Sequence, residues 1–279
     1  MSLEVPQEKN RELLPFLKWA GGKRWLTHNN ENIFPPCNSY NRYIEPFLGS
    51  GAIFFHLKPK NAILADINED LIETYNVVKN NPMELENMLS YHHKKHSKEY
   101  YYNIRNKNFK NSIKKAAKFI YLNRTCWNGL YRVNKKGEFN VPIGTKTKVI
   151  LGTDDFLSIS KLLKDVKIVK MNYFETISYA QKGDFIFIDP PYTVKHNSNA
   201  FVKYNETLFS WRDQEQLRDC ISRALKNGCK ILVTNAFHNS IKELYKGLGE
   251  MICLSRPSIL ASNSRKRGIY EELIIKCGY

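Results

Sequence analysis

The sequence predicts an α/β fold: a mostly parallel sheet whose strands alternate with helices, interrupted by a basic and mainly helical insert. Three observations predict it. Of the 279 residues, 42% are hydrophobic, which suffices for one large core or for one core plus a smaller inserted domain. Short apolar runs alternate with helix-like stretches on both sides of a polar middle. Lys and Arg outnumber Asp and Glu by 43 to 27, a net charge of +16 that favours nucleic acid over a membrane as partner.

The first region, residues 1–68, begins the α/β alternation. The apolar run 43–47 predicts a strand that leads into a glycine turn over 48–51. A helix and a second strand are expected next, and this strand ends in Asp66. Strand, glycine turn, helix, strand and acid in this order are typical of a nucleotide-binding unit, in which the acid accepts ribose hydroxyls. The alternative is that Asp66 caps the helix that begins near Glu69.

The second region, residues 69–153, is the predicted insert. Its apolar residues recur at helical spacing over 116–122, and basic residues crowd the stretch 91–118. Lys135-Lys136-Gly137 lies between two β-prone runs and predicts a hairpin turn, with its glycine at positive φ. We therefore expect an insert that presents a basic surface and a hairpin.

The third region resumes the alternation of strands and helices. A helix is predicted from about 212 to 227, closed by Gly228. The last two strands of the region are expected to form an antiparallel pair at the sheet edge. The predicted strands of this region cover residues 167–171, 185–189, 229–234, 251–254 and 271–275.

Several classes of protein are excluded at this level. No apolar stretch approaches the roughly 18 residues of a membrane-spanning helix, and the polar stretch 1–11 lacks the apolar core of a signal peptide. The six cysteines are scattered and form no C-x-x-C pair, which predicts free thiols rather than a disulfide framework or a metal site. We expect a cytoplasmic protein that binds no metal and does not associate with membranes.

The most informative motif is Asp189-Pro190-Pro191-Tyr192, which directly follows the apolar run 184–188. Because proline has no N–H to donate, the strand must end there in a stiff turn, at the sheet edge where open α/β folds bind ligands. A carboxylate and a prolyl carbonyl can accept the two hydrogens of an exocyclic amine, while Tyr192 stacks on the base. The motif predicts a site for an amine-bearing flat base; the alternative is an ordinary strand-to-loop turn with a capping Asp.

Two glycine motifs accompany this turn. Lys18-Trp19-Ala20-Gly21-Gly22-Lys23 allows the backbone to approach a ligand closely, and its last lysine can hold a carboxylate or phosphate. A surface turn beside a core Trp explains this hexapeptide equally well. Glu45-Pro46-Phe47-Leu48-Gly49-Ser50-Gly51 follows a strand and opens a helix, but it lacks the lysine of a P-loop and the last glycine of a dinucleotide fingerprint. We expect a nucleoside-bearing cofactor that is not a dinucleotide.

Together with Asp66, these motifs resemble the signature motifs of the DNA adenine-N6 methyltransferases. Their order resembles the α arrangement of that family, the Dam-type enzymes: cofactor motif, recognition insert, then Asp-Pro-Pro-Tyr. The loop 128–142 is similar to the recognition hairpin of members that modify adenine in GATC. The resemblance implies a Rossmann-like methyltransferase sheet in a discontinuous catalytic domain, residues 1–68 and 154–279, around an inserted target-recognition domain, residues 69–153.

The resemblance implies S-adenosylmethionine as the cofactor. Lys23 would hold its carboxylate, the second glycine motif would line its methionine and sugar, and Asp66 would accept its ribose hydroxyls. Asp189 and the carbonyl of Pro190 would bind the adenine amine, and Tyr192 would stack on the base. The expected catalytic residues are Asp189, Pro190 and Tyr192, and the expected cofactor-binding residues are Trp19, Ala20, Gly21, Lys23, Glu45, Pro46, Phe47, Gly49, Ser50, Gly51, Asp66 and Asp189.

The resemblance also implies double-stranded DNA as the partner. Lys18 and Arg132 match positions that read guanine edges, Leu130 and Pro142 match apolar contacts to neighbouring bases, and Trp127 stands where the family often has an intercalating aromatic residue. This Trp is larger than the Tyr of many relatives. The expected DNA-binding residues are Lys18, Trp127, Asn128, Leu130, Arg132, Asn140 and Pro142.

The same residues suggest a mechanism. An adenine amine is a poor nucleophile because its lone pair is delocalised into the ring. Hydrogen bonds from both N–H groups to Asp189 and the Pro190 carbonyl would favour a tetrahedral nitrogen, so we expect direct displacement of the methyl group, promoted by positioning and electrostatics. Because a duplex hides this nitrogen, the base must be extruded, at a cost of a few kcal/mol.

Two other functions fit parts of the sequence. One is an RNA or protein amine methyltransferase, although such relatives more often carry Asn where this chain has Asp189 and lack the hairpin. The other is a non-catalytic nucleic-acid-binding module, which would not need intact cofactor motifs. A cognate restriction endonuclease is a possible partner, and we expect a monomer or a weak dimer.

The chain departs from relatives at Thr145, where they often have Arg, and the basic run 262–267 fits either a family motif or a solvated loop.

Overall fold

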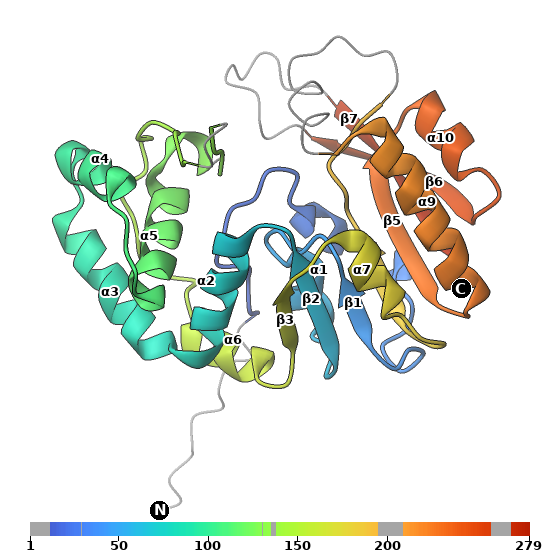
Figure 1. Ribbon diagram of the computed structural model, residues 1–279, viewed down its shortest axis with the longest axis horizontal. Helices are drawn as coiled ribbons and strands as arrows, with labels where there is room; N and C mark the ends of the chain where they lie inside the picture. The colour runs from blue at the N-terminus through green and yellow to red at the C-terminus, as the bar shows by residue number, and fades with distance from the viewer. Residues whose placement is uncertain (1–11, 29, 130, 135–137, 195–208, 258–268) are drawn as a thin grey trace, which may run out of the picture.

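A computed structural model of the chain describes residues 12–28, 30–129, 131–134, 138–194, 209–257 and 269–279, and it has the predicted α/β fold (Figure 1). A seven-stranded sheet has the order β3-β2-β1-β4-β5-β7-β6. The strands are β1 (Tyr43–Glu45), β2 (Ala62–Asp66), β3 (Lys167–Lys170), β4 (Phe185–Ile188), β5 (Lys230–Ala236), β6 (Glu250–Pro257) and β7 (Ile269–Cys277). Each predicted strand is present, with ends that differ from the prediction by a few residues.

The sheet is mostly parallel and has an antiparallel edge, as predicted. Strands β3, β2, β1, β4 and β5 pair in parallel, whereas β7 pairs antiparallel with both β5 and β6. The reversed strand β7 lies one position inside the edge, which β6 forms. Because β7 runs against its neighbours, its first residues lie beside the carboxyl end of β5: Glu272 is opposite Ala236. The carboxyl ends of the parallel strands and the start of β7 therefore share one edge.

Both faces of the sheet are buried, and alternate residues of each central strand point to opposite cores. Tyr43 and Phe185 belong to one core, whereas their neighbours Ile44 and Ile186 belong to the other. The first core also contains residues of α1 and α2, and the second contains residues of α7, α9 and α10. These helices are α1 (Ala52–Leu57), α2 (Glu69–Asn80), α7 (Tyr173–Ser178), α9 (Trp211–Lys226) and α10 (Asn239–Tyr245).

The helix ends follow ordinary capping chemistry. The Asn68 side chain accepts a hydrogen bond from the backbone N–H of Leu71 and so caps α2. At the start of α9, Ser210 and Asp213 form a capping box, which places Trp211 in the first turn. The helix ends at the predicted place, and Gly228 follows with φ +81°.

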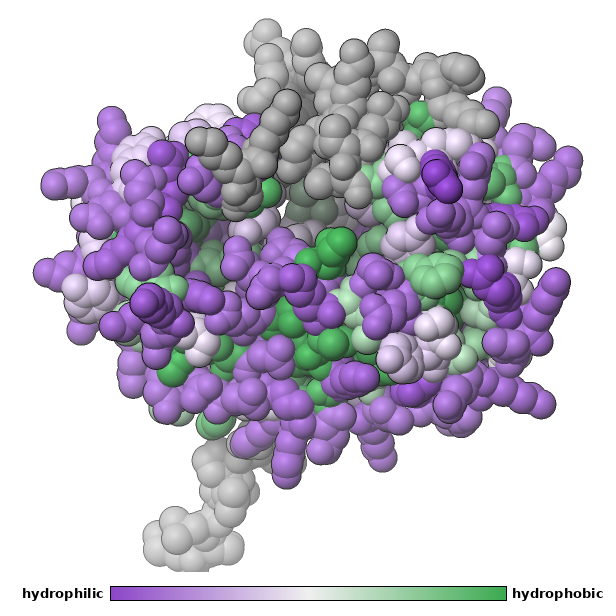
Figure 2. Space-filling model, in the orientation of Figure 1, coloured by the Kyte–Doolittle hydropathy of each residue, from purple (hydrophilic) through white to green (hydrophobic). Residues whose placement is uncertain are grey.

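The region predicted as an insert is helical up to residue 125. Figure 1 shows its helices to one side of the sheet, and Figure 2 shows mostly hydrophilic side chains over them. Leu71, Tyr101 and Ile120 nevertheless belong to the same buried core as Tyr43 and Phe185 of the sheet. The helices thus share a continuous core with the sheet, and the division at 69–153 stays a prediction. The other helices of this region are α3 (Pro82–Lys95), α4 (Lys98–Asn106) and α5 (Ser112–Thr125), and α6 (Phe156–Leu163) follows the region.

After α5 the chain forms the two arms of a hairpin. Cys126 and Ile143 pair as an antiparallel bridge, as do Val133 and Phe139. The described residues also form the short 3₁₀ helices η1 (Lys23–Thr27), η2 (Glu31–Ile33) and η3 (Trp127–Gly129), the last at the start of the hairpin. The arms confirm the predicted hairpin, but its turn, residues 135–137, and the positive φ predicted there lie outside the described residues.

The structure also bears on the predictions about the cysteines and about membrane-spanning helices. All six cysteines are free thiols, of which Cys37 and Cys253 are exposed and the others are buried. Among the helices within the described residues, none combines the length and the apolar character needed to cross a bilayer.

Candidate active site

Acidic residues gather at one edge of the sheet. Glu45 ends β1, Asp66 ends β2, and Asp189 follows the last residue of β4. Since these three strands are parallel neighbours, their carboxyl ends meet, as expected for a binding crevice in an open α/β sheet. The sequence predicted Asp66 and Asp189 at strand ends and Glu45 inside the strand run 43–47; the structure ends β1 at Glu45 and brings the three residues to the same edge.

The glycine turn after β1 is closed by backbone bonds and packed against Trp19. The N–H of Leu48 donates to the carbonyl of Ala65 at 3.0 Å. Gly49 has φ +48°, and a Cβ atom there would lie 2.7 Å from Cδ1 of Trp19. A side chain is therefore excluded both by conformation and by space. The turn brings the motif around Trp19 into direct contact with the second glycine motif.

Asp66 is oriented by the same turn. Its Oδ2 accepts a hydrogen bond from the N–H of Gly49 at 3.1 Å, and its Oδ1 accepts one from the N–H of Asn68 at 2.9 Å. Because Asn68 is the cap of α2, the alternative interpretation of Asp66 as the cap is wrong. Burial raises the pKa of Asp66, and the backbone donors oppose that rise. The next residue, Ile67, exposes 74% of its surface, which leaves an apolar face beside the carboxylate.

Asp189 lies at the centre of a polar network. Its Oδ1 atom accepts a hydrogen bond from Oγ1 of Thr234 at 2.6 Å and lies 2.9 Å from Nζ of Lys23. Within the described part of the chain, both of these contacts use Oδ1, so Oδ2 is the oxygen that faces a ligand in this site. Burial raises the pKa of Asp189. The contacts with Lys23 and Thr234 lower this pKa, whereas the charge of Glu272 raises it.

Lys23 links Asp189 to the rest of the network. Its ammonium donates to the carbonyl of Gly21 at 2.6 Å, lies 3.6 Å from Oε2 of Glu272, and sits 5.0 Å from the centre of the Tyr192 ring. The Tyr192 hydroxyl donates to the same Glu272 oxygen at 2.7 Å. The expectation that Lys23 binds the cofactor's carboxylate stays a prediction; in the structure its partners are two carboxylates of the chain.

Glu45 adds a further carboxylate to this edge of the sheet. It is 2% exposed, accepts a hydrogen bond from the Tyr43 hydroxyl at 2.9 Å, and has a pKa raised by burial. Asp189 and Asp66 are close enough to raise that pKa further. The acids Glu45, Asp66 and Asp189 thus stand at neighbouring strand ends, and such an acidic edge suits a positively charged ligand.

Sequence reasoning missed Thr234 and Glu272. Thr234 ends the apolar part of β5, and Glu272 starts the buried part of β7. Neither belongs to a recognisable motif, and their place at the site depends on the strand order β4-β5-β7. The one available signal was Glu272 itself, an acid directly before the apolar run of a predicted sheet strand.

On the recognition side, the backbone of Lys18 is held by Asn123. The N–H of Lys18 donates to Oδ1 of Asn123 at 2.9 Å, and Nδ2 of Asn123 donates to the carbonyl of Lys18 at 2.8 Å. A Cβ atom on Gly129 would lie 2.7 Å from Cδ of Lys18, so Lys18 also packs on the start of the hairpin. Burial, and the ammonium of Lys146 beside it, lower the pKa of Lys18 to about 8.

The other predicted DNA-binding residues lie along the hairpin. Trp127 is 49% exposed, Asn128 has φ +56°, and Nε of the exposed Arg132 donates to Oδ1 of Asn140 at 3.1 Å. The carbonyl of Pro142 accepts from the N–H of Trp127 at 2.9 Å. Leu130 lies outside the described residues. Among the described residues, neither Trp127 nor Arg132 forms a hydrogen bond, ion pair or ring contact with a member of the network around Asp189.

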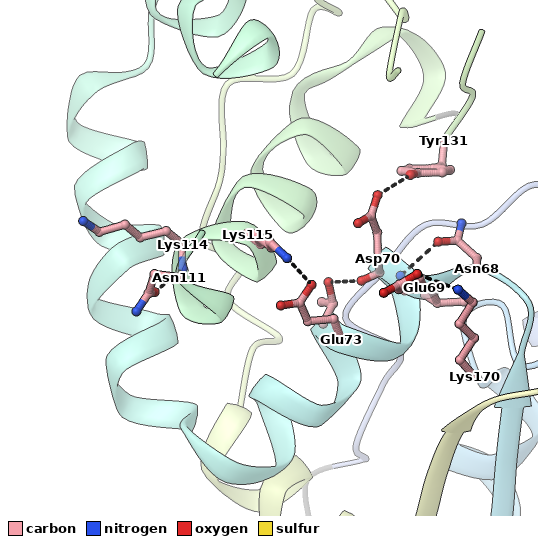
Figure 3. Close-up of polar contacts among 11 residues, drawn as sticks. Asn68, Glu69, Asp70, Glu73, Asn111, Lys114, Lys115, Tyr131 and Lys170 are labelled. Atoms are coloured by element: carbon pink, nitrogen blue, oxygen red, sulfur yellow. Dashed lines mark hydrogen bonds and ion pairs between the residues drawn. The ribbon is translucent and has the colours of Figure 1, made fainter. Parts of the chain in front are cut away.

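An aromatic stack connects the hairpin to the cofactor motif. The rings of Tyr131 and Trp19 stack with centres 5.7 Å apart. The Tyr131 hydroxyl also donates to Oδ2 of Asp70, in the first turn of α2, at 3.1 Å (Figure 3). Because Trp19 in turn packs on the Gly49 turn, the hairpin and the glycine turn are joined through two rings.

Comparison with known proteins gives consistent similarities. The family model of the D12 class N6 adenine-specific DNA methyltransferases matches residues 19–256. A type II methyltransferase of Lactococcus lactis subsp. cremoris, M1.LlaDCHI, is 37% identical over 283 residues, 98% of each protein. A type II methyltransferase of Methanocaldococcus jannaschii, M.MjaIII, is 39% identical over 287 residues, 95% of this chain and 99% of that protein. A DNA adenine methylase of Haemophilus influenzae is 33% identical over 276 residues, 96% and 94% of the two chains.

Proposed function

We propose that this chain, which belongs to the D12 class of N6 adenine-specific DNA methyltransferases, methylates adenine within the duplex sequence GATC after the target base has left the helix. As in its family, the enzyme acts on DNA and its cofactor is S-adenosylmethionine. The GATC site rests on the resemblance of the loop 128–142 to the hairpin of GATC-modifying enzymes, and on relatives named DNA adenine methylase.

The observation that carries the proposal is the fixed carboxylate of Asp189 at the carboxyl edge of the sheet. Thr234 and Lys23 hold its Oδ1, which turns Oδ2 into the acceptor for one hydrogen of the adenine amine. The carbonyl of Pro190 accepts the other hydrogen, and the Tyr192 ring stacks on the extruded base. With both hydrogens bound, the nitrogen lone pair is directed away from the ring, and Asp189 is placed to take the proton that leaves after methylation.

The acidic edge of the sheet fits the cofactor. When bound, S-adenosylmethionine supplies the methyl group from a positively charged sulfur. The carboxylates of Glu45, Asp66 and Asp189 at neighbouring strand ends favour such a cation. Trp19, Ala20, Gly21 and Lys23, together with the turn 45–51, would hold its methionine portion, and Asp66 would accept its ribose hydroxyls with lone pairs that the backbone donors leave free. The exposed face of Ile67 would cover part of the adenosine.

For DNA recognition we assign residues 69–153 as the target-recognition domain. Exposed Trp127 would enter the base stack, and Lys18 and Arg132 would read guanine edges, with Asn128, Leu130, Asn140 and Pro142 contacting neighbouring bases. Arg132 is exposed, and its hydrogen bond to Asn140 uses Nε, which leaves the two terminal nitrogens for a bidentate contact. The basic residues over 91–118 would hold phosphates.

Two relatives bear the name type II methyltransferase. By analogy with them, we propose that a cognate restriction endonuclease acts on the same site, and that the methyltransferase works as a monomer or a weak dimer. A single chain suffices for a short palindrome, because it can read the two strands in successive binding events.

Replacing Asp189 tests the proposal. In Asp189→Ala the amine loses an acceptor, so methyl transfer should be abolished while binding to duplex DNA is largely retained. Asp219→Ala, which removes an exposed carboxylate on α9, is the matched control and should behave as wild type. Transfer of labelled methyl groups to duplexes with and without GATC measures the reaction, and an electrophoretic mobility shift measures binding.

Retained turnover in Asp189→Ala would refute the catalytic assignment. Equal methylation of duplexes with and without GATC would refute the proposed recognition site and leave the catalytic assignment intact.

A further inference from the structure

Glu272 is a buried acid outside the predicted motifs. It lies on β7, opposite Ala236 of β5, and is 2% exposed. Its Oε2 atom accepts the hydroxyl of Tyr192 at 2.7 Å and lies 3.6 Å from the ammonium of Lys23. Its two named partners are thus residues of the proposed methyl-transfer site.

Burial of this carboxylate has a cost, which its contacts with Tyr192 and Lys23 help to offset. Lys23 lies closer to Asp189, at 2.9 Å, than to Glu272. Within the described residues, Asp189 and Glu272 thus share the ammonium of Lys23, and two acids placed so closely favour a positive charge that develops nearby.

Glu272 also fixes the ring that would stack on the base. A tyrosine ring can pivot about its Cα–Cβ bond unless its far end is held. Here the hydroxyl is bonded to Glu272, and the Lys23 ammonium lies 5.0 Å from the ring centre. The plane of the Tyr192 ring is therefore set from both its edge and its face.

The same carboxylate acts on Asp189 through charge. Among the residues that the structure describes, the charged and titratable groups that interact with Asp189 are Lys23, Glu45, Tyr192 and Glu272. Lys23 favours the ionised form of Asp189, whereas Glu272 opposes it and raises its pKa. A more basic Asp189 is a better acceptor for the amine hydrogen and for the departing proton.

We propose that Glu272 is a positioning residue of the methyl-transfer site, which holds the Tyr192 ring and the Lys23 ammonium in place. This inference rests on the proposed function of Asp189 and Tyr192. It predicts that Glu272→Gln, which keeps an acceptor oxygen for both partners, changes the pH dependence of methyl transfer and leaves the binding of cofactor and DNA near wild type.

The test compares Glu272→Gln, Glu272→Ala and the control Glu271→Gln, which removes an exposed carboxylate one residue away on the same strand. Glu272→Gln removes the charge and keeps an oxygen for Tyr192. We expect the acid limb of the pH–rate profile to move to lower pH, because the pKa of Asp189 falls when a like charge is removed. Glu272→Ala should in addition slow single-turnover transfer by about ten- to a hundredfold. Glu271→Gln should change neither quantity.

A double-mutant cycle with Tyr192→Phe separates positioning from a general loss of structure. If Glu272 acts through the Tyr192 hydroxyl, the effects of Glu272→Ala and Tyr192→Phe on the rate will be less than additive. Cofactor affinity by calorimetry and the urea midpoint should stay near wild type in Glu272→Gln.

An unshifted acid limb in Glu272→Gln, additive effects in the cycle, or loss of cofactor binding in Glu272→Gln would each overturn the inference. These outcomes are distinct from failure of the proposed function, which would appear as absent adenine methylation by the wild type or as turnover by Asp189→Ala.

Discussion

The network around Asp189 and the hairpin around Arg132 are held in very different ways. In the network, Lys23 and Glu272 are buried, and several contacts converge on Asp189 and Tyr192. On the hairpin, Arg132 is exposed, and its side chain bonds to another exposed residue, Asn140. The difference teaches that the proposed methyl-transfer site is arranged within the protein, whereas the proposed recognition surface presents its polar groups to solvent, where DNA could engage them.

The largest expected effect concerns the last turn of α5, after which the hairpin begins. Arg124, near the end of α5, is 2% exposed and makes a paired contact to Asp154 at 2.6 and 2.7 Å. It also donates to the carbonyls of Phe16 and Val149. Arg124→Met should lower the free energy of unfolding by about 3–5 kcal/mol, because a buried carboxylate loses its partner. Urea denaturation measures this.

The exposed pair between Lys115 and Glu73 provides the control for Arg124. Its lysine side chain is 43% exposed, so Lys115→Met should cost at most about 1 kcal/mol. A similar loss of unfolding free energy in both variants would contradict this comparison, because the buried pair of Arg124 would then stabilise the protein no more than the exposed pair of Lys115.

The next largest effect concerns specificity. Arg132→Ala should lose about 1–3 kcal/mol of discrimination at one base pair, because a bidentate contact to guanine disappears. Methylation rates on GATC duplexes with single base-pair changes measure it. The control Lys114→Ala removes an exposed basic residue of α5 and should weaken all duplexes alike. If Arg132→Ala also weakens all sequences equally, Arg132 contacts phosphate.

The smallest effect is a pH dependence of DNA affinity. Free Lys18 has a pKa of about 8, lowered by burial and by Lys146, and an acceptor on DNA favours its protonated form. Binding above that pKa must therefore take up a proton, so affinity should be insensitive to this group below about pH 7 and fall by up to about tenfold per unit above pH 8. Titrations of labelled duplex from about pH 7 to 9 measure the slope. Lys18→Arg stays charged and should flatten it; equal slopes in both proteins would contradict the assignment.

Much of this arrangement is visible in the sequence because it depends on local rules. An apolar run that ends in Asp66 or Asp189 specifies a strand with an acid at its carboxyl end, and parallel neighbours bring those ends together. Gly49 and Gly228 mark positions of positive φ where a turn or a helix end requires them. The family resemblance adds the cofactor and the order of the motifs.

The rest could not be predicted because it depends on which distant elements meet. Thr234 and Glu272 reach Asp189 and Tyr192 only through the order and register of β4, β5 and β7. Asn123 holds the backbone of Lys18 across 105 positions of sequence. The continuous core beneath α2 and α5 was equally hidden, because helical spacing shows that a face is buried but not what it is buried against.

The reversed direction of β7 has a consequence for the biogenesis of the enzyme. Tyr192 and its carboxylate partner are 80 positions apart. At roughly 5–20 residues per second on a ribosome, about 4–16 s pass between the synthesis of the two. A nascent chain therefore carries the complete Asp-Pro-Pro-Tyr sequence well before Glu272, which accepts the hydrogen bond of the Tyr192 hydroxyl, has been translated. The network is complete only when β7 has paired with β5.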